Sequence, residues 1–429
     1  MQQEHERFGQ RAAENVLIVI LALTPVLVAV RYRWAQLVFP FAAAAILFLL
    51  VRAPDSRTRI FETLRSWISG PMALVGMVAL LWIVLTVIVA TDRLTAAIIV
   101  VKALGFVGAA LAACAILTTV SRRRVFPLLV WTYLAAVLGA GFTAVTEGAA
   151  HRIFDCCRGG MQADVTGSAI MTALLVWPVA GWLFASGRRL GALLVVVLAC
   201  AVVSVSRSGA SGIALAAGLL TIGIGAWRPR AAVAVPLAIT IAGFASALFL
   251  GDLKALPEPF NFLDSLSAFH AVGRVEIWSY YTDLFWQRPW TGFGPGSERL
   301  LGDSAFSSSF TNTIPPDNSR LHPHNTPVQI LIEFGIVGMV LALIAAITTA
   351  IQVIKTDPPR SPFAIAPAAG FATASLVNFG LWEWWWLSLV FIALIFASQL
   401  PRWGEAVDAA RPVPASAANN LLPNAESAG

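Results

Sequence analysis

The chain has 429 residues, of which 58% are hydrophobic and 12% charged, and its mean hydropathy is +0.76. This composition excludes an ordinary soluble domain and indicates a polytopic membrane protein, whose helices satisfy their own backbone hydrogen bonds. The formal net charge of +6 comes mostly from Arg in short loops and does not indicate a nucleic-acid-binding protein.

Twelve apolar segments are long enough, or nearly so, to form transmembrane helices, each of which needs about 20 residues. The predicted spans are 14–30, 35–51, 71–90, 95–120, 125–146, 164–186, 190–205, 209–226, 231–250, 326–354, 362–380 and 383–400. Eleven spans are an alternative, because the segments on either side of Arg207 are also compatible with one broken helix. The expected fold is therefore all-α, with about 12 transmembrane helices.

The orientation in the membrane follows from the distribution of Lys and Arg. The segments assigned to the inside contain 17 of these residues, whereas the short outer loops contain 6. Cytoplasmic loops carry such an excess. We therefore expect both termini in the cytoplasm and the long loop outside, which for a bacterial inner membrane means the periplasm. The predicted organisation is a membrane region over 1–250, a large periplasmic loop over 251–325, a second membrane region over 326–403, and a disordered tail over 404–429.

The predicted periplasmic loop concentrates most of the polar side chains that could carry chemistry. Apolar residues recur at helical spacing between 271 and 287, and Pro289 ends this short helix. Arg274 and Trp278 are four residues apart and share one face of it. The segment 302–319 is rich in Ser, Thr, Asn and Pro, and we expect a mobile flap there.

His324 stands at the mouth of the tenth predicted span, in the sequence His-Asn-Thr-Pro. Asn325 and Pro327 are typical of a helix start, which is a purely structural interpretation. The positive end of the helix dipole also favours a neutral imidazole, which can accept a proton. His324 is therefore a candidate general base at a membrane face.

Two arginines are candidate anion ligands at the same face. Arg207 lies between two apolar runs, flanked by Ser206 and Ser208, and its forked guanidinium suits phosphate oxygens. The alternative for Arg207 is a side chain that snorkels to the interface, and for Arg274 an ordinary solvated charge.

Two further features have structural interpretations. Glu383 lies among four Trp residues at 382 and 384–386, a cluster that predicts an aromatic belt at the membrane interface or a surface for a sugar or prenyl chain. Cys156 and Cys157 are adjacent in a loop and are either free thiols or a vicinal disulfide. The cysteines have no zinc-ligand spacing, and we predict no metal site.

In combination, these residues resemble the O-antigen ligase and polymerase superfamily. The ligase pattern of His-Asn, nine residues and Gly-x-x-Gly is met by His324-Asn325, Gly335 and Gly338. The next two residues are Met and Val, where the ligase pattern has hydroxy residues. Further matching positions are Ser206–Gly209, Arg274, Ile277–Trp278, Pro289, Gly292–Gly294 and Glu333–Phe334.

The resemblance implies a GT-C-like, metal-independent and cofactor-independent glycosyltransferase. Such enzymes take a glycan from undecaprenyl diphosphate at the periplasmic face, and attack in line inverts the anomeric carbon. Arg207 and Arg274 would bind the diphosphate and stabilise the leaving group. His324 would be the catalytic base, and Asn325 would bind and position the acceptor hydroxyl.

The acceptor distinguishes the members of the superfamily. The His-Asn pattern favours a ligase, which transfers to lipid A-core. The spacing of Arg207 and Gly218 is also compatible with a polymerase that extends a second lipid-linked glycan, and a protein O-oligosaccharyltransferase is a third alternative. A transporter of polysaccharide or lipid-linked sugar belongs to another class, and it predicts charges spread through the spans rather than gathered at one outer loop.

Overall fold

The computed structural model describes residues 2–52, 54–68, 70–120, 122–146, 161–249, 271–301, 323–357 and 359–405. Several predictions fall outside these residues, namely those for the flap at 302–319, the cysteine pair 156–157, and the tail from 406 onward. Over the described residues the protein is helical, and its only bridge of β type joins Arg360 and Arg402.

The helices of the first half are α1 (Gln2–Ala22), α2 (Thr24–Val30), α3 (Ala35–Arg52), α4 (Pro54–Ile68), α5 (Pro71–Ile88), α6 (Arg93–Thr119) and α7 (Arg122–Val145), with a 3₁₀ turn η1 (Tyr32–Trp34). The second half contains α9 (Met161–Ala185), α10 (Arg189–Val205), α11 (Gly209–Trp227), η2 (Pro229–Val233), α12 (Ala234–Ala247), α14 (Ala271–Phe285), α16 (Thr326–Lys355), α17 (Pro362–Val377) and α18 (Trp384–Ser398).

Each of the twelve predicted spans contains a helix. Among the described residues, nine helical segments are long and apolar enough to cross a membrane. The helices α10, α17 and α18 are apolar but shorter, with 17, 16 and 15 residues. An all-α, multi-pass architecture is therefore confirmed, whereas the count of twelve spans stays a prediction.

The Arg-rich segment between the second and third predicted spans forms a helix of its own, α4. Ile60 on this helix is buried, whereas Arg57, Phe61 and Arg65 are exposed. The sequence-based search for apolar runs misses such a helix because only one of its faces is apolar.

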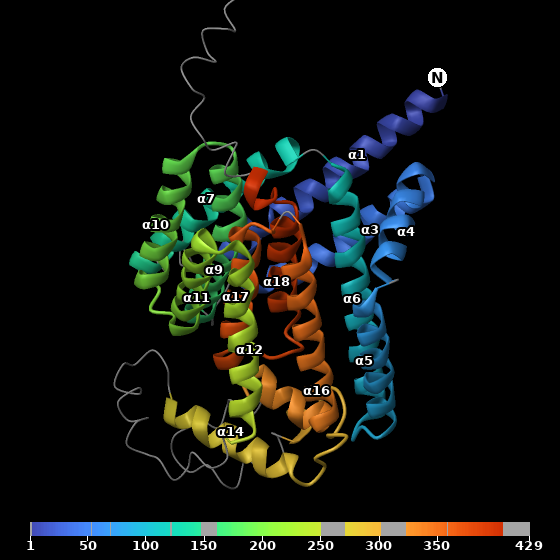
Figure 1. Ribbon diagram of the computed structural model, residues 1–429, viewed down its shortest axis with the longest axis vertical. Coiled ribbons are helices and arrows are strands. Elements are labelled where there is room, and N and C mark those ends of the chain that lie inside the picture. The colour runs from blue at the N-terminus through green and yellow to red at the C-terminus, as the bar shows by residue number, and fades with distance from the viewer. Residues whose placement is uncertain are drawn as a thin grey trace, which may run out of the picture.

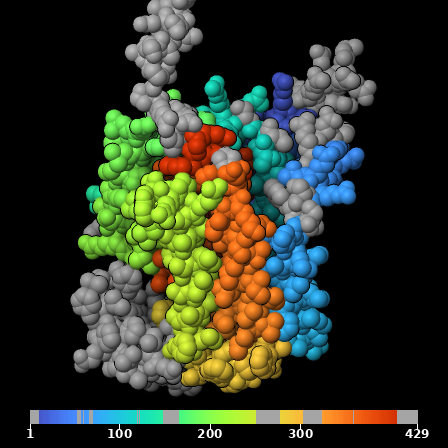
Figure 2. Space-filling model, in the orientation of Figure 1, coloured from blue at the N-terminus to red at the C-terminus, as the bar shows by residue number. Residues whose placement is uncertain are grey.

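The helices form a bundle with α14 lying across one end, as Figure 1 shows. The main hydrophobic core joins α1, α3, α7, α9, α10 and α18. A second buried cluster packs α14 against α12 and α16 through Tyr281, Phe285, Phe244 and Ile332. In the space-filling view of Figure 2, the segment 277–301 lies over the ends of α12 and α16. This second cluster fixes α14 at the bundle end.

The antiparallel helices α11 and α17 pack closely because glycines lie at their interface. A Cβ atom on Gly225 would meet Pro362, and one on Gly370 would lie close to the carbonyl oxygen of Ala214. Small residues allow two helix backbones to approach in this way. These contacts fix the register of the pair and therefore the level of each helix end.

Candidate functional site

The turn before α16 holds His324 and Asn325 in a defined geometry. Asn325 is the N-cap of α16, where its Oδ1 accepts a hydrogen bond from the Val328 amide at 3.0 Å. The sequence-based prediction of a capped helix start is therefore confirmed. His324 has φ 47°, a left-handed conformation that is uncommon for a residue with a side chain. Such strain, of about 1–3 kcal/mol, tends to persist where the surroundings require it.

The side chains of three successive residues contact backbone oxygens at the end of α17. His324 Nδ1 lies 3.0 Å from the Asn378 carbonyl oxygen. Asn325 Nδ2 donates to the Leu376 oxygen at 2.9 Å, and the Thr326 hydroxyl donates to the Phe379 oxygen at 3.0 Å. The turn is thus joined to the end of α17 at three points. Asn325 is only 4% exposed and is hydrogen-bonded through both Nδ2 and Oδ1, so little of its surface is accessible to a substrate in this structure.

The contact with Asn378 determines the tautomer of His324. A carbonyl oxygen only accepts hydrogen bonds, so Nδ1 must carry the proton. In the neutral ring, Nε2 is then the nitrogen with the lone pair. The neutral ring therefore presents Nε2 as its proton-accepting nitrogen, whereas an imidazolium would make the same contact through Nδ1.

Arg207 occupies the turn between α10 and α11, where it has φ 52°. Its side chain is exposed and, within the described part of the chain, its guanidinium has no hydrogen-bond or ion-pair partner. The register of α11 against α17 places Ala214 beside Gly370. Since each residue of a helix adds 1.5 Å, Arg207 and Asn378 come to about the same level. Arg207 and His324 therefore lie at the same end of the bundle.

Arg274 lies on α14, and its side chain is outside the described residues, as is the whole of His322. The next turn of α14 carries Trp278, whose indole Nε1 donates to the Pro323 carbonyl oxygen at 2.7 Å. This bond fixes α14 to the residue directly before His324. The helix that carries Arg274 is therefore attached to the turn that carries His324.

The glycine motifs form a break in α16 and the loop that caps it. Gly335 has φ 66° and ψ −169°, which interrupts the helix. The amides of Phe293 and Gly294 donate to the oxygens of Ile332 and Glu333 at 2.8 and 2.9 Å. Carbonyl groups that lose their helical partners at the break are thus satisfied by the glycine loop.

Two more hydrogen bonds complete the break. The Trp82 indole donates to the Phe334 oxygen at 3.0 Å, and the Ile336 amide donates to the Pro289 oxygen at 2.8 Å. Gly292 has φ 64°, and a Cβ atom there would collide with the backbone of Glu333. The motifs around Gly292 and Gly335, distant in sequence, are therefore two halves of one structural unit.

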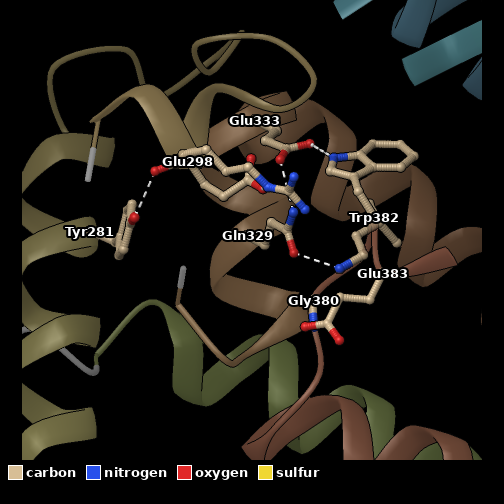
Figure 3. A network of polar contacts seen from close by, with 9 residues as sticks. Tyr281, Glu298, Gln329, Glu333, Gly380, Trp382 and Glu383 are labelled. Carbon is tan, nitrogen blue, oxygen red and sulfur yellow. Dashed lines mark hydrogen bonds and ion pairs between the residues drawn. The ribbon is translucent and has the colours of Figure 1, made fainter. Parts of the chain in front are cut away.

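A network of buried polar side chains lies behind this unit (Figure 3). Glu333 is fully buried and accepts hydrogen bonds from Gln329 Nε2 at 2.9 Å and Trp382 Nε1 at 2.6 Å. Gln329 Oε1 accepts the Leu381 amide at 2.6 Å. Glu298 is also buried, at 2% exposure, and its carboxyl group lies close to that of Glu333. No motif singles out Gln329 or Glu298, although polar residues in or beside an apolar span are a recognisable signal.

The tryptophan cluster lies inside the protein, in contrast to the predicted interfacial belt. Trp382 and Trp385 are each 8% exposed, and Trp386 is 1% exposed. The indoles of Trp382 and Trp385 donate to Glu333 and Glu383. The cluster packs against the end of α17, where Trp386 stacks on Phe379 with ring centroids 4.4 Å apart. These aromatic rings serve as core residues.

Comparison with known proteins identifies similarity in the part of the chain that contains the site. Residues 192–343 match the protein-family model described as O-antigen ligase. A candidate polysaccharide ligase of Rickettsia felis is 24% identical over 64% of this chain and 67% of its own length. Candidate polysaccharide ligases of Rickettsia conorii and Rickettsia typhi are 24% and 22% identical over 32% and 54% of their lengths.

The matches thus span from about a third to two thirds of these relatives. No solved structure matches the chain significantly. The family match covers Arg207, Arg274, His324 and the break at Gly335, so the resemblance drawn from the motifs is confirmed.

Among the described residues, no three His, Cys, Asp or Glu side chains gather as metal ligands would.

Proposed function

We propose that this protein is a glycosyltransferase that uses a polyprenyl-linked donor, because residues 192–343 match the O-antigen ligase family model. It moves a glycan from undecaprenyl diphosphate to a hydroxyl group of lipid A-core. The reaction takes place at the periplasmic face of a bacterial inner membrane, with both termini in the cytoplasm. It requires neither a metal nor another cofactor.

The geometry of His324 carries this proposal. The Asn378 oxygen, 3.0 Å from Nδ1, orients the ring so that Nε2 is the proton-accepting nitrogen of its neutral form. Arg207, which is exposed and has no side-chain partner among the described residues, lies at the same end of the bundle. A base and a cation at one face are the groups that an acceptor hydroxyl and a diphosphate leaving group require.

The proposed mechanism is a single displacement. The acceptor hydroxyl oxygen attacks the anomeric carbon while His324 Nε2 takes the hydroxyl proton. The bond between the anomeric carbon and the diphosphate oxygen breaks, and its electron pair stays on the diphosphate. Attack from the opposite side inverts the anomeric configuration. The imidazolium then releases its proton to solvent, which regenerates the base.

The two arginines stabilise the departing diphosphate in this mechanism. A guanidinium can donate two parallel hydrogen bonds to phosphate oxygens, and it keeps its charge at every physiological pH. No described residue competes for the Arg207 guanidinium, and the bond from Trp278 to Pro323 joins α14, which carries Arg274, to the turn before α16. Asn325 supports the reaction by holding the turn that carries His324.

Transfer by the purified protein in lipid nanodiscs tests the proposal. The donor is an undecaprenyl-diphosphate-linked glycan, and the acceptors are lipid A-core, a second lipid-linked glycan and a Ser-containing peptide, each with and without EDTA. We expect transfer to lipid A-core that EDTA does not affect. Transfer only to the second glycan or only to the peptide would replace the ligase assignment. Absence of transfer to every acceptor, with uptake of the donor into sealed vesicles, would favour a transporter.

A further inference from the structure

The buried carboxyl group of Glu333 plays no part in the mechanism above. Its side chain is fully buried in the first turns of α16, ahead of the break at Gly335. Burying a carboxyl group is costly unless its oxygens are hydrogen-bonded. Both oxygens are satisfied here, one by Gln329 and the other by Trp382, at 2.9 and 2.6 Å. The burial of Glu333 therefore depends on these two partners, and they show which part of the protein its carboxyl group is bonded to.

Both hydrogen-bond partners of Glu333 connect it to the segment 378–383, which we call the α17–α18 loop. Trp382 belongs to this loop, and Gln329 accepts the amide of Leu381 at 2.6 Å. Glu383 holds the same loop from within, since its carboxylate accepts the Gly380 amide at 3.4 Å. Figure 3 shows these residues converging from α16 and the loop. Glu333 is therefore bonded to the loop directly at Trp382, and indirectly at Leu381 through Gln329.

The α17–α18 loop also supplies the oxygen that orients His324. Asn378 and Phe379 begin this loop, and their carbonyl oxygens hold His324 and Thr326 at 3.0 Å each. The loop is therefore bonded to α16 at two places, once through the Glu333 network and once through the His324 turn. A shift at the first place would move the Asn378 oxygen at the second.

We propose that Glu333 is a positioning residue that holds the α17–α18 loop so that Asn378 orients His324. Glu333 does not touch the substrate in this role, and it acts through Trp382 and through Gln329. The catalytic consequence rests on the proposed glycosyl transfer, whereas the effect on the loop does not. A misplacement of about 1 Å at a reacting group can reduce a rate about 100-fold.

The donor and acceptor count of this network provides a sharp test. In Glu333→Gln, the new amide oxygen can still accept from Trp382, but its NH₂ group then faces the NH₂ group of Gln329. If Gln329 turns over, its NH₂ group faces the amide of Leu381 instead, so one clash between donors persists. The exchanged double variant Gln329→Glu/Glu333→Gln removes the clash. The new carboxylate at 329 accepts both the Leu381 amide and the new amide at 333.

The experiment compares four proteins in nanodiscs, namely the parent, Glu333→Gln, the exchanged double variant and Tyr133→Phe. Tyr133→Phe is the matched control because it removes one buried hydrogen bond, from its hydroxyl to the Thr172 oxygen, in the main core. Donor transfer gives kcat and KM, and hydrogen exchange followed by mass spectrometry reports on peptides covering 323–328 and 378–383. Protein abundance and thermal stability are measured in parallel.

We expect Glu333→Gln to lower kcat about 10–100-fold with little change in the KM for the donor, and to speed exchange in both peptides. The exchanged double variant should restore kcat and slow exchange, whereas Tyr133→Phe should leave both at the parental level. If the exchanged double variant slowed exchange to the parental rate but kcat stayed low, the proposal would be overturned. The carboxyl group at 333 would then have a role in catalysis other than holding the loop. Parental kcat and exchange in Glu333→Gln would also overturn it.

The exchange measurement separates this inference from the proposed function. If the parent transfers no glycan, the proposed function fails, yet faster exchange in Glu333→Gln and its reversal in the exchanged variant would still support the loop-positioning role. If the parent transfers glycan but exchange in the α17–α18 loop does not respond to Glu333→Gln, the positioning role alone fails.

Discussion

The Trp278 indole donates to the Pro323 carbonyl oxygen at 2.7 Å, and this bond connects α14 to the turn that carries His324. Trp278 is one helical turn beyond Arg274 on the same face of α14. The bond therefore couples the position of a proposed donor ligand to that of the proposed base. Two parts of the site that lie on separate segments of the chain are held together in this way.

The first prediction concerns this connection. Trp278→Phe removes the indole donor but keeps an aromatic ring, so we expect a loss of about 0.5–1.5 kcal/mol in stability. The KM for the lipid-linked donor should rise about 10-fold, because loss of the bond lets α14 and Arg274 shift. A misplacement of about 1 Å can reduce a rate about 100-fold, and we expect a smaller shift here. Steady-state transfer assays check this. Trp286→Phe is the control, since Trp286 is 58% exposed, and a matching loss there would refute the specific role of the bond.

The second prediction concerns the break in α16. Gly335 has φ 66°, and a Cβ atom on it would collide with the backbone of Trp290. We expect Gly335→Ala to lose roughly 3 kcal/mol or more of stability and to reduce the amount of folded protein in the membrane. Size-exclusion chromatography of a fluorescent fusion measures this. Gly223→Ala is the control because a Cβ atom there has no neighbour within 4 Å. Parental abundance of Gly335→Ala would mean that the break tolerates a side chain.

The sequence predicts the membrane helices well because apolar runs report directly on lipid-soluble segments. The sequence does not predict α4, because only one face of that helix is apolar. It also does not predict that the Trp cluster is buried, because its burial depends on packing against distant helices. The core residue Trp386 stacks on Phe379, a contact that the tryptophan-rich composition alone cannot distinguish from an interfacial belt.

The candidate site was accessible from sequence only in part. His324, Arg207 and Gly335 were recognisable from motif spacing, and each has a positive φ in the structure. The partners were not recognisable, because His324 is bonded to a carbonyl oxygen 54 residues away and Glu333 to an indole 49 residues away. Such pairs follow from the register of α16 against the α17–α18 loop, which no local pattern encodes.

The third prediction concerns the arginines. Arg207→Ala and Arg274→Ala should each abolish most transfer, and Arg274→Lys should retain only part of it, since Lys lacks the fork. Arg207→Gly should be at least as stable as Arg207→Ala, because Gly relieves the cost of φ 52°, roughly 1–2 kcal/mol. Transfer rates and melting temperatures provide the comparison. An alanine variant that inserts normally and transfers at the parental rate would identify its arginine as a snorkelling or solvated residue.

The fourth prediction concerns orientation, which follows from the excess of Lys and Arg in the loops assigned to the cytoplasm. Single cysteines at Ser304 and Arg123, in a background without other cysteines, should react differently with a membrane-impermeant maleimide in intact spheroplasts. We expect labelling at 304 and protection at 123, with both labelled after lysis. Labelling of both positions before lysis would remove the assigned topology, and the periplasmic location of the site with it.

The last prediction concerns His324. Replacement of a general base costs typically 10²–10⁴-fold in rate, so His324→Ala should lose transfer on that scale while donor binding persists. His324→Gln should also be inactive, because the side chain can keep a hydrogen bond to Asn378 but carries no basic nitrogen. Transfer by the parent should fall as the pH is lowered, since protonation of Nε2 removes the lone pair that accepts the hydroxyl proton. His322→Ala is the matched control and should be nearly silent. If His322→Ala were the inactive variant, or if His324→Ala turned over normally at saturating acceptor, His324 would not be the base.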